Sequence, residues 1–162
     1  MVTTRDEKAA ARVAELAVQH GITVAAAESL TGGQVSTALA AAEQASTWYR
    51  GAVVAYSSDV KHELLGVPTE EVVHAEAASA MARRTRELLL ADVVVAITGA
   101  GGPSPQDGRE PGTVFLAVDA PDHHRVVRLQ LDGDEPVEVL SGSTSAALDS
   151  LVEYLEGRSG GA

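Results

Sequence analysis

The sequence contains no cysteine, only 3% aromatic residues, and just two lysines, Lys8 and Lys61, among its twelve basic residues. The lack of cysteine excludes disulfides, thiol nucleophiles and thiolate metal sites. Because aromatic residues are so few, the hydrophobic fraction of 45% consists mainly of Ala, Val and Leu, which favours close packing of helices on a sheet. We expect one domain over residues 1–162, with a frayed tail from about residue 158.

Positive charge is also scarce. The net charge is −11 and the isoelectric point about 4.7, so the chain as a whole repels the phosphate backbone of nucleic acids. The one basic cluster, Arg83, Arg84 and Arg86, falls among glutamates in a helical pattern and is interpreted as a solvated face. No apolar run reaches the roughly 18 residues of a membrane span, and residues 1–8 lack a signal-peptide core. We therefore expect a soluble cytoplasmic protein that binds neither nucleic acid nor membrane.

The hydrophobic pattern predicts an α/β fold. Strands and helices alternate over roughly the first 100 residues, which indicates a mostly parallel sheet covered by helices on both faces. The last two predicted strands form an antiparallel hairpin, and the β-branched run at 92–98 is the best candidate for a central strand. The predicted helices are 7–20, 34–42, 60–65, 68–90 and 144–155, and the predicted strands are 22–27, 52–56, 92–98, 113–118 and 124–131.

Three loops are expected to share one edge of this sheet, because ligands in open parallel sheets bind beyond the carboxyl ends of the strands. These loops are 28–33, 56–61 and 98–112. The last is rich in Gly and Pro, and its length is typical of a functional loop. The first and the last of these loops each contain a glycine-rich turn. Two such turns at one edge of the sheet indicate a ligand site more strongly than either turn alone.

The first loop places Ser29, Thr31 and the pair Gly32-Gly33 at the start of a predicted helix. Hydroxyls and backbone N–H groups at a helix N-terminus suit an anionic ligand or a developing oxyanion. Paired glycines at such a turn are also common as a packing device, so both interpretations stay open. Glu28 either acts as an acid or base beside Ser29 or supports the helix terminus.

Lys61 follows the second predicted strand by about one turn and is expected on the same edge as Ser29. A lysine in a partly desolvated cleft can lose its proton near neutral pH and act as a general base, which an arginine cannot do. Tyr56, five residues earlier, is placed to relay a proton or to orient either partner. The alternative is that Lys61 is a surface lysine and Tyr56 a residue at a strand end.

The five histidines show no spacing of a zinc site, so they are interpreted as structural, and neither a metal nor a cofactor is predicted. His123 and His124 fall in the predicted hairpin turn.

Six motifs extend over nearly the whole chain in a fixed order. They are Ala-Glu-Ser-Leu-Thr-Gly-Gly at 27–33, Trp-Tyr-Arg-Gly-Ala-Val-Val-Ala-Tyr-Ser-Ser-Asp-Val-Lys at 48–61, Leu-Leu-Gly-Val at 64–67, Ala-Met-Ala at 80–82, Thr-Gly-Ala-Gly-Gly-Pro at 98–103 and Pro-Gly-Thr-Val at 111–114. With these motifs the chain resembles the CinA C-terminal domain family, the nicotinamide mononucleotide (NMN) amidohydrolases. The resemblance implies a three-layer α/β/α sandwich in its stand-alone form, and a homo-oligomer of two or more copies.

The resemblance also implies a reaction, the hydrolysis of the carboxamide of NMN to nicotinic acid mononucleotide and ammonia. By this resemblance Ser29 is the nucleophile, Lys61 is its base and Tyr56 is a relay or orienting group. The residues expected to bind the oxyanion or the substrate phosphate are Thr31, Gly32 and Gly33, with Thr98, Gly99 and Gly102 on the opposite wall.

The chain departs from the family pattern in three places. The family usually has Gly-Asp-Arg and a further Arg before the last helix, whereas residues 133–140 contain no arginine. The long loop reads Arg-Glu-Pro-Gly at 109–112 instead of Lys-Pro-Val-Gly, which makes Arg109 the candidate replacement for phosphate binding. Residues 71–74 read Glu-Val-Val-His where the family has Gly-Ala-Val-Ser. Two alternatives therefore stand beside NMN hydrolysis: a catalytically weak nucleotide-binding or interaction protein, and an amidase for another small amide.

Overall fold

The computed structural model describes residues 1–133 and 135–159. Its helices are α1 (Thr4–His20), α2 (Gln34–Ala40), α3 (Ala45–Trp48), α4 (Ser58–Glu63), α5 (Ala75–Leu89) and α6 (Pro136–Ser159). Its strands are β1 (Val24–Glu28), β2 (Tyr49–Val54), β3 (Val93–Gly99), β4 (Thr113–Ala120) and β5 (His123–Gln130).

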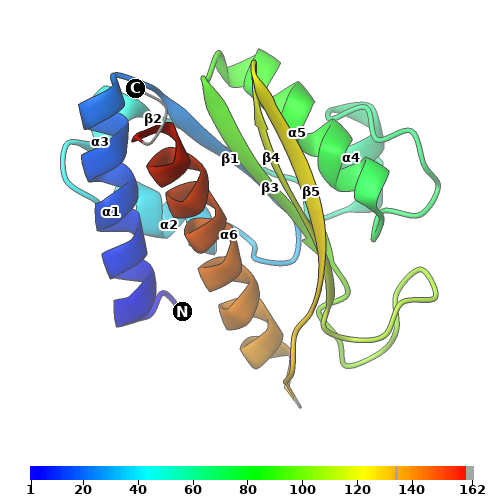
Figure 1. The fold of residues 1–162 in the computed structure, drawn as a ribbon. Helices are drawn as coiled ribbons and strands as arrows, with labels where there is room; N and C mark the ends of the chain where they lie inside the picture. The colour runs from blue at the N-terminus through cyan, green and yellow to red at the C-terminus, as the bar shows by residue number, and fades with distance from the viewer. Residues whose placement is uncertain (134, 160–162) are drawn as a thin grey trace.

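The strands form one mixed sheet in the order β2-β1-β3-β4-β5. The pairs β1·β2 and β1·β3 are parallel, while β3·β4 and β4·β5 are antiparallel. Helices α1 and α6 lie on one side of the sheet and α4 and α5 on the other (Figure 1). The predicted α/β class, the three layers, the central position of residues 92–98 and the late hairpin are all confirmed.

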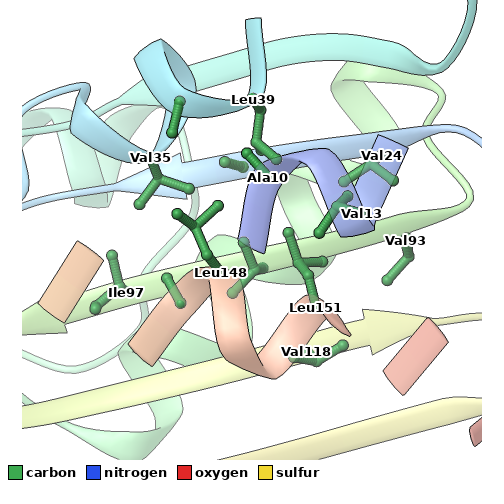
Figure 2. Close-up of a cluster of buried hydrophobic side chains, with 14 of the residues drawn as sticks. Ala10, Val13, Val24, Val35, Leu39, Val93, Ile97, Val118, Leu148 and Leu151 are labelled. Carbon is green, nitrogen blue, oxygen red and sulfur yellow. The ribbon is translucent and has the colours of Figure 1, made fainter. Parts of the chain in front are cut away.

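Two apolar cores form because successive strand side chains point to opposite faces. In β3, Val93, Val95 and Ile97 join the core under α1, α2 and α6, which Figure 2 shows in close-up. Val94 and Ala96 join the core under α5. Every residue of β1 and β3 is buried, as expected for parallel strands covered on both faces.

The predicted long helix from residue 68 was wrong at its start, since α5 begins only at Ala75. His74 adopts an extended conformation and caps α5 by accepting a hydrogen bond from Glu76 N. The N–H groups of Val72 and Val73 donate instead to the carboxylate of Asp107, in the distant loop 98–112. Residues 68–74 are therefore held against this loop rather than in a helical turn.

The start of the last helix also differs from the prediction. Helix α6 begins eight residues before the predicted residue 144, at Pro136, and α3 was not predicted. Arg158, expected in a frayed tail, lies in α6 and donates to the hydroxyl of Tyr154; residues 160–162 lie outside the described residues. None of the helices in the described ranges has the length and apolar character needed to cross a membrane.

Candidate active site

The three predicted loops lie at one edge of the sheet. The register aligns Glu28, the last residue of β1, with Val54, the last residue of β2, and with Ile97 of β3, which continues for two more residues to Gly99. Ser29 N donates to Ile97 O at 3.1 Å, which fixes the serine directly beyond the strand end. A hollow of about 400 Å³ opens there, lined by Ser29, Leu30, Tyr56, Gly99, Gly101, Gly102, Pro103, Ser104, Pro105, Gln106, Pro136 and Leu140. The expected grouping of Ser29, Tyr56, Gly99 and Gly102 is thus present in the structure.

Glu28 is fully buried below this hollow. Its carboxylate accepts hydrogen bonds from Thr31 Oγ1 at 2.6 Å and from the backbone N of Gly33, Val35 and Ser36 at 3.0, 3.2 and 2.7 Å. A carboxylate that accepts from the first turn of a helix stabilises the otherwise unpaired N–H groups and the helix dipole. Of the two interpretations of Glu28, the structure therefore favours support of the helix terminus.

The hydroxyl of Thr31 and the backbone N–H groups of Gly32 and Gly33 all donate within the turn. Thr31 Oγ1 and Gly33 N donate to Glu28, and Gly32 N donates to Ser29 O at 3.0 Å. None of the three lines the hollow, although all three were expected to hold an oxyanion or a phosphate. The backbone N–H groups of Leu30 and Thr31 have no acceptor among the described residues, and of these two residues only Leu30 lines the hollow.

Lys61 lies in α4, a short helix that Ser57 caps by accepting from Val60 N at 3.2 Å. Its side chain is only 1% exposed, and Nζ donates to Tyr56 O at 2.9 Å. Burial lowers the pKa of Lys61 below its ordinary 10.5, and the charge of Asp107 opposes that shift. The surface-lysine interpretation is therefore wrong.

No hydrogen bond joins Ser29 Oγ to Lys61 Nζ, and Lys61 does not line the hollow. Tyr56 is the residue shared by the two: its carbonyl oxygen accepts from Lys61 Nζ, and Tyr56, which is 73% exposed, lines the hollow together with Ser29.

The third loop contributes Gly99 and Gly102 to the wall. A Cβ on Gly99 would lie 2.8 Å from Thr113 O, so the close approach of β4 requires glycine here. Thr98, also expected on this wall, is buried and donates to Val72 O at 2.7 Å, which anchors residues 68–74.

Arg109 lies away from the hollow. Its guanidinium stands 5.7 Å from the centre of the Phe115 ring, and its buried Nε has no hydrogen-bond partner among the described residues. Since no Lys or Arg is among the described residues that line the hollow, Arg109 does not replace the absent arginines of residues 133–140 in this structure.

Sequence reasoning missed Asp107. Asp107 and Gly108 both have positive φ, and Gln106 and Arg109 exchange backbone hydrogen bonds on either side of them, which makes a tight hairpin tip. The carboxylate accepts from Val72 N at 2.7 Å and Val73 N at 2.9 Å. The dipeptide Asp-Gly, a strong turn signal, was the available clue.

The contribution of α6 was also missed, because its first turn was predicted as loop. Pro136 and Leu140, both in α6, are among the residues that line the hollow. The described residues contain no group of three or more His, Asp or Glu side chains arranged to hold a metal ion.

The fold is a three-layer α/β/α sandwich in which Ser29 lies at a strand-to-helix turn and the buried Lys61 lies in the short helix α4. These features define an α/β protein whose candidate site lies where the parallel strands end. The family model "CinA C-terminal domain" matches residues 6–155. The chain belongs to the CinA C-terminal domain family.

Relatives agree with this assignment. A protein of Desulforamulus reducens is 33% identical over 158 residues, and a CinA-like protein of Gloeobacter violaceus is 38% identical over 153 residues. The alignments cover 94% and 90% of this chain but only 38% and 36% of those proteins, so the chain spans less than two fifths of their length.

Solved structures share the fold. The competence-damaged protein (CinA) superfamily protein from Enterobacter cloacae is 29% identical with a TM-score of 0.87, over 93% of this chain and 92% of that one. The competence damage-inducible protein A (ComA) from Klebsiella pneumoniae is 28% identical with a TM-score of 0.88, over 93% and 97% of the two chains.

Proposed function

We propose that this protein hydrolyses the carboxamide of nicotinamide mononucleotide to nicotinic acid mononucleotide and ammonia, with Ser29 as nucleophile and Lys61 as base. The observation that carries the proposal is the buried Lys61 bonded to the carbonyl of Tyr56, on the same edge of the sheet as Ser29. A lysine held in an apolar environment is the type of base that a serine nucleophile needs when no imidazole is adjacent.

In the proposed first step, Ser29 Oγ attacks the carboxamide carbon and gives its proton to neutral Lys61 Nζ. For this transfer Lys61 exchanges its bond to Tyr56 O for one to Ser29 Oγ, directly or through a water. Hydrogen bonds of catalytic groups are often incomplete before substrate binds. Lys61 then protonates the departing ammonia, and a water molecule hydrolyses the acyl-Ser29 ester by the same route in reverse.

The donor we assign to the oxyanion is the backbone N–H of Leu30. Leu30 follows the nucleophile directly and is one of the residues that line the hollow, and its N–H has no acceptor among the described residues. The residue after a nucleophile commonly supplies this donor at a strand-to-helix turn. One such donor is worth about 3 kcal/mol of transition-state stabilisation. Thr31, Gly32 and Gly33 then act by holding the turn in shape through Glu28 and Ser29 O, not by direct contact.

A second candidate function is hydrolysis of a small amide without a phosphate group. The observation that favours it is the hollow's lining, which contains neither Lys nor Arg among the described residues. Ammonia release from NMN and from nicotinamide riboside, measured side by side, separates the two. Turnover of NMN alone supports the first, and turnover of the riboside but not of NMN supports the second.

The third alternative is a protein that binds the nucleotide without turning it over. Calorimetry with NMN, paired with the ammonia assay, tests it: binding without ammonia release would replace the enzymatic proposal. The homo-oligomer expected from the resemblance stays a prediction, which light scattering of the full chain can test.

A further inference from the structure

Three polar side chains at the other end of the sheet form a hydrogen-bonded chain that the proposed NMN reaction does not use. His124 Nδ1 lies 2.8 Å from Asp119 Oδ1, and His124 Nε2 lies 2.5 Å from Ser79 Oγ. Serine, imidazole and carboxylate linked in this order are the components of a serine nucleophile with its base and orienting group. We propose that Ser79, His124 and Asp119 form a second catalytic centre, one that hydrolyses esters of small acyl groups.

The fold fixes two of these residues directly opposite each other. Asp119 of β4 and His124 of β5 are a cross-strand pair, and their neighbours Ala117 and Val126 pack on the α5 side of the sheet. Ser79 lies in the second turn of α5, which covers that face near β4 and β5 (Figure 1). The arrangement thus depends on the packing of a helix on a hairpin, both of which are regular elements.

The hydrogen bonds determine which nitrogen of neutral His124 carries the proton. An ionised carboxylate can only accept, so His124 Nδ1 donates to Asp119 Oδ1. Nε2 is then free to accept from the hydroxyl of Ser79. This is the tautomer that a general base needs in order to take a proton from serine.

Asp119 is held as a charged, oriented acceptor. Its side chain is 5% exposed, and Arg86 Nε donates to its second oxygen, Oδ2, at 2.7 Å. Because Arg86 takes Oδ2, Oδ1 stays directed at His124. The sequence suggested that Arg83, Arg84 and Arg86 form only a solvated face. The structure shows that Arg86 also has a structural role, because it orients Asp119.

The backbone of α5 cannot supply an oxyanion donor at Ser79, because its N–H groups are used within the helix. Arg83 follows Ser79 by one turn on the same helical face. Its side chain is 61% exposed, and its Nε lies 4.0 Å from Asp119 Oδ1, so it can move to face a negative charge at the serine. A hollow of about 490 Å³ beside Arg83 is lined by His124 and has space for a small acyl group and its leaving alcohol. Ser79 is not among the residues that line this hollow, and it meets the hollow only through its hydrogen bond to His124.

The reaction is complete with water as the only other reactant. Ser79 Oγ attacks the ester carbonyl carbon while its proton passes to His124 Nε2. The bond between that carbon and the alkoxide oxygen breaks, and the alkoxide takes the proton from Nε2. Water then attacks the acyl-Ser79 ester with the same base and releases the carboxylic acid.

This centre is spatially separate from the Ser29 hollow. Asp119 pairs with Val94, near the beginning of β3, whereas Gly99 at the hollow is the last residue of that strand. The second centre therefore does not rest on the proposed NMN reaction, and the two can fail independently.

The test uses the full chain with Ser29→Ala, which removes the first nucleophile, and 4-nitrophenyl acetate as the probe. We expect release of 4-nitrophenol, with the acetyl group found on the peptide that contains Ser79 by mass spectrometry. Adding S79A or H124Q should lower the rate by about 100-fold, the usual contribution of a nucleophile–base pair at the low end. Adding Ser46→Ala, an exposed helical serine on α3, should leave the rate unchanged.

The same rate with and without S79A, or acetyl groups only on other residues, would overturn the proposal. H124Q guards against a misfolded variant, because it keeps a side chain of similar size at the same strand position. Circular dichroism of each variant shows whether the fold is intact. If H124Q is folded and as active as its parent, His124 is not the base and the proposal is wrong.

Discussion

Lys61 Nζ donates to the carbonyl oxygen of Tyr56 at 2.9 Å. This hydrogen bond joins the buried amine of Lys61 to the backbone of Tyr56, and Tyr56 is one of the residues that line the hollow at Ser29. Lys61 is therefore buried next to a residue that lines the hollow, and Tyr56 O is the hydrogen-bond acceptor that Nζ would give up to reach Ser29. Two predictions concern this residue.

Replacing Lys61 by Arg should lower kcat for ammonia release by about 10²–10⁴-fold, the typical contribution of a general base. Arginine keeps the positive charge but cannot give up its proton in a protein. K8R, which changes an exposed lysine in α1, is the matched control and should keep full activity. If K61R retained activity, Lys61 would act as a cation and not as a base.

The lowered pKa of Lys61 predicts how activity and stability depend on pH. Activity should rise as pH rises through the lowered pKa, below 10.5, because only the neutral amine accepts a proton. Between that pKa and 10.5 the unfolded chain binds more protons at this residue than the folded chain does, so the folded state gains stability as pH rises.

Denaturant unfolding of wild type and K61M over this pH range measures the effect. The difference in unfolding free energy, wild type minus K61M, should increase with pH up to about 10.5 and then level off. A difference that stays constant would show that the pKa of Lys61 is the same in the folded and unfolded chains.

Glu28→Gln should destabilise the fold by about 2–4 kcal/mol, because a carboxylate that accepts four hydrogen bonds is replaced by an amide whose NH₂ cannot accept. The turn that presents Ser29 should loosen with it. Urea unfolding of E28Q measures the loss in unfolding free energy. The control is Glu70→Gln, a substitution of an exposed glutamate. Equal stability of the two variants would mean that the turn does not depend on this carboxylate.

Gly99→Ala should also destabilise, by about 1–3 kcal/mol, because the new Cβ would lie 2.8 Å from Thr113 O and from Val114 Cγ2. Gly157→Ala in α6 is the matched control: its Cβ would meet nothing within 4 Å, and alanine favours a helix by up to about 1 kcal/mol. Thermal unfolding should therefore shift down for G99A and up for G157A. A stable G99A would show that β4 can move away from β3 at little cost.

Much of the fold followed from local patterns. The β-branched run of β3 and the alternation of strands and helices were enough to predict a sheet with a central strand at 92–98 and the serine, tyrosine and glycine loops at one edge. These features follow from the spacing of apolar residues along the chain, which can be seen in the sequence itself.

The remaining features depend on contacts between distant residues. Asp107 accepts hydrogen bonds from the N–H groups of Val72 and Val73, which precede it by 35 and 34 residues in the sequence. Because of these bonds, residues 72 and 73 are not part of the helix and α5 begins later than predicted. Burial of Glu28 turns Thr31 and Gly33 inward, although their residue types suit an anion site.

The chain Ser79–His124–Asp119 spans three elements, and its sequence spacing indicates no site. Only the packing of α5 on the β4–β5 hairpin brings these three residues together.

Ammonia release from NMN by wild type and by Ser29→Ala decides whether Ser29 is the nucleophile of an amidohydrolase. We expect ammonia and nicotinic acid mononucleotide from the wild type, and a loss of at least about 10³-fold in a folded S29A protein. Ammonia release from S29A at the wild-type rate would contradict this role of Ser29.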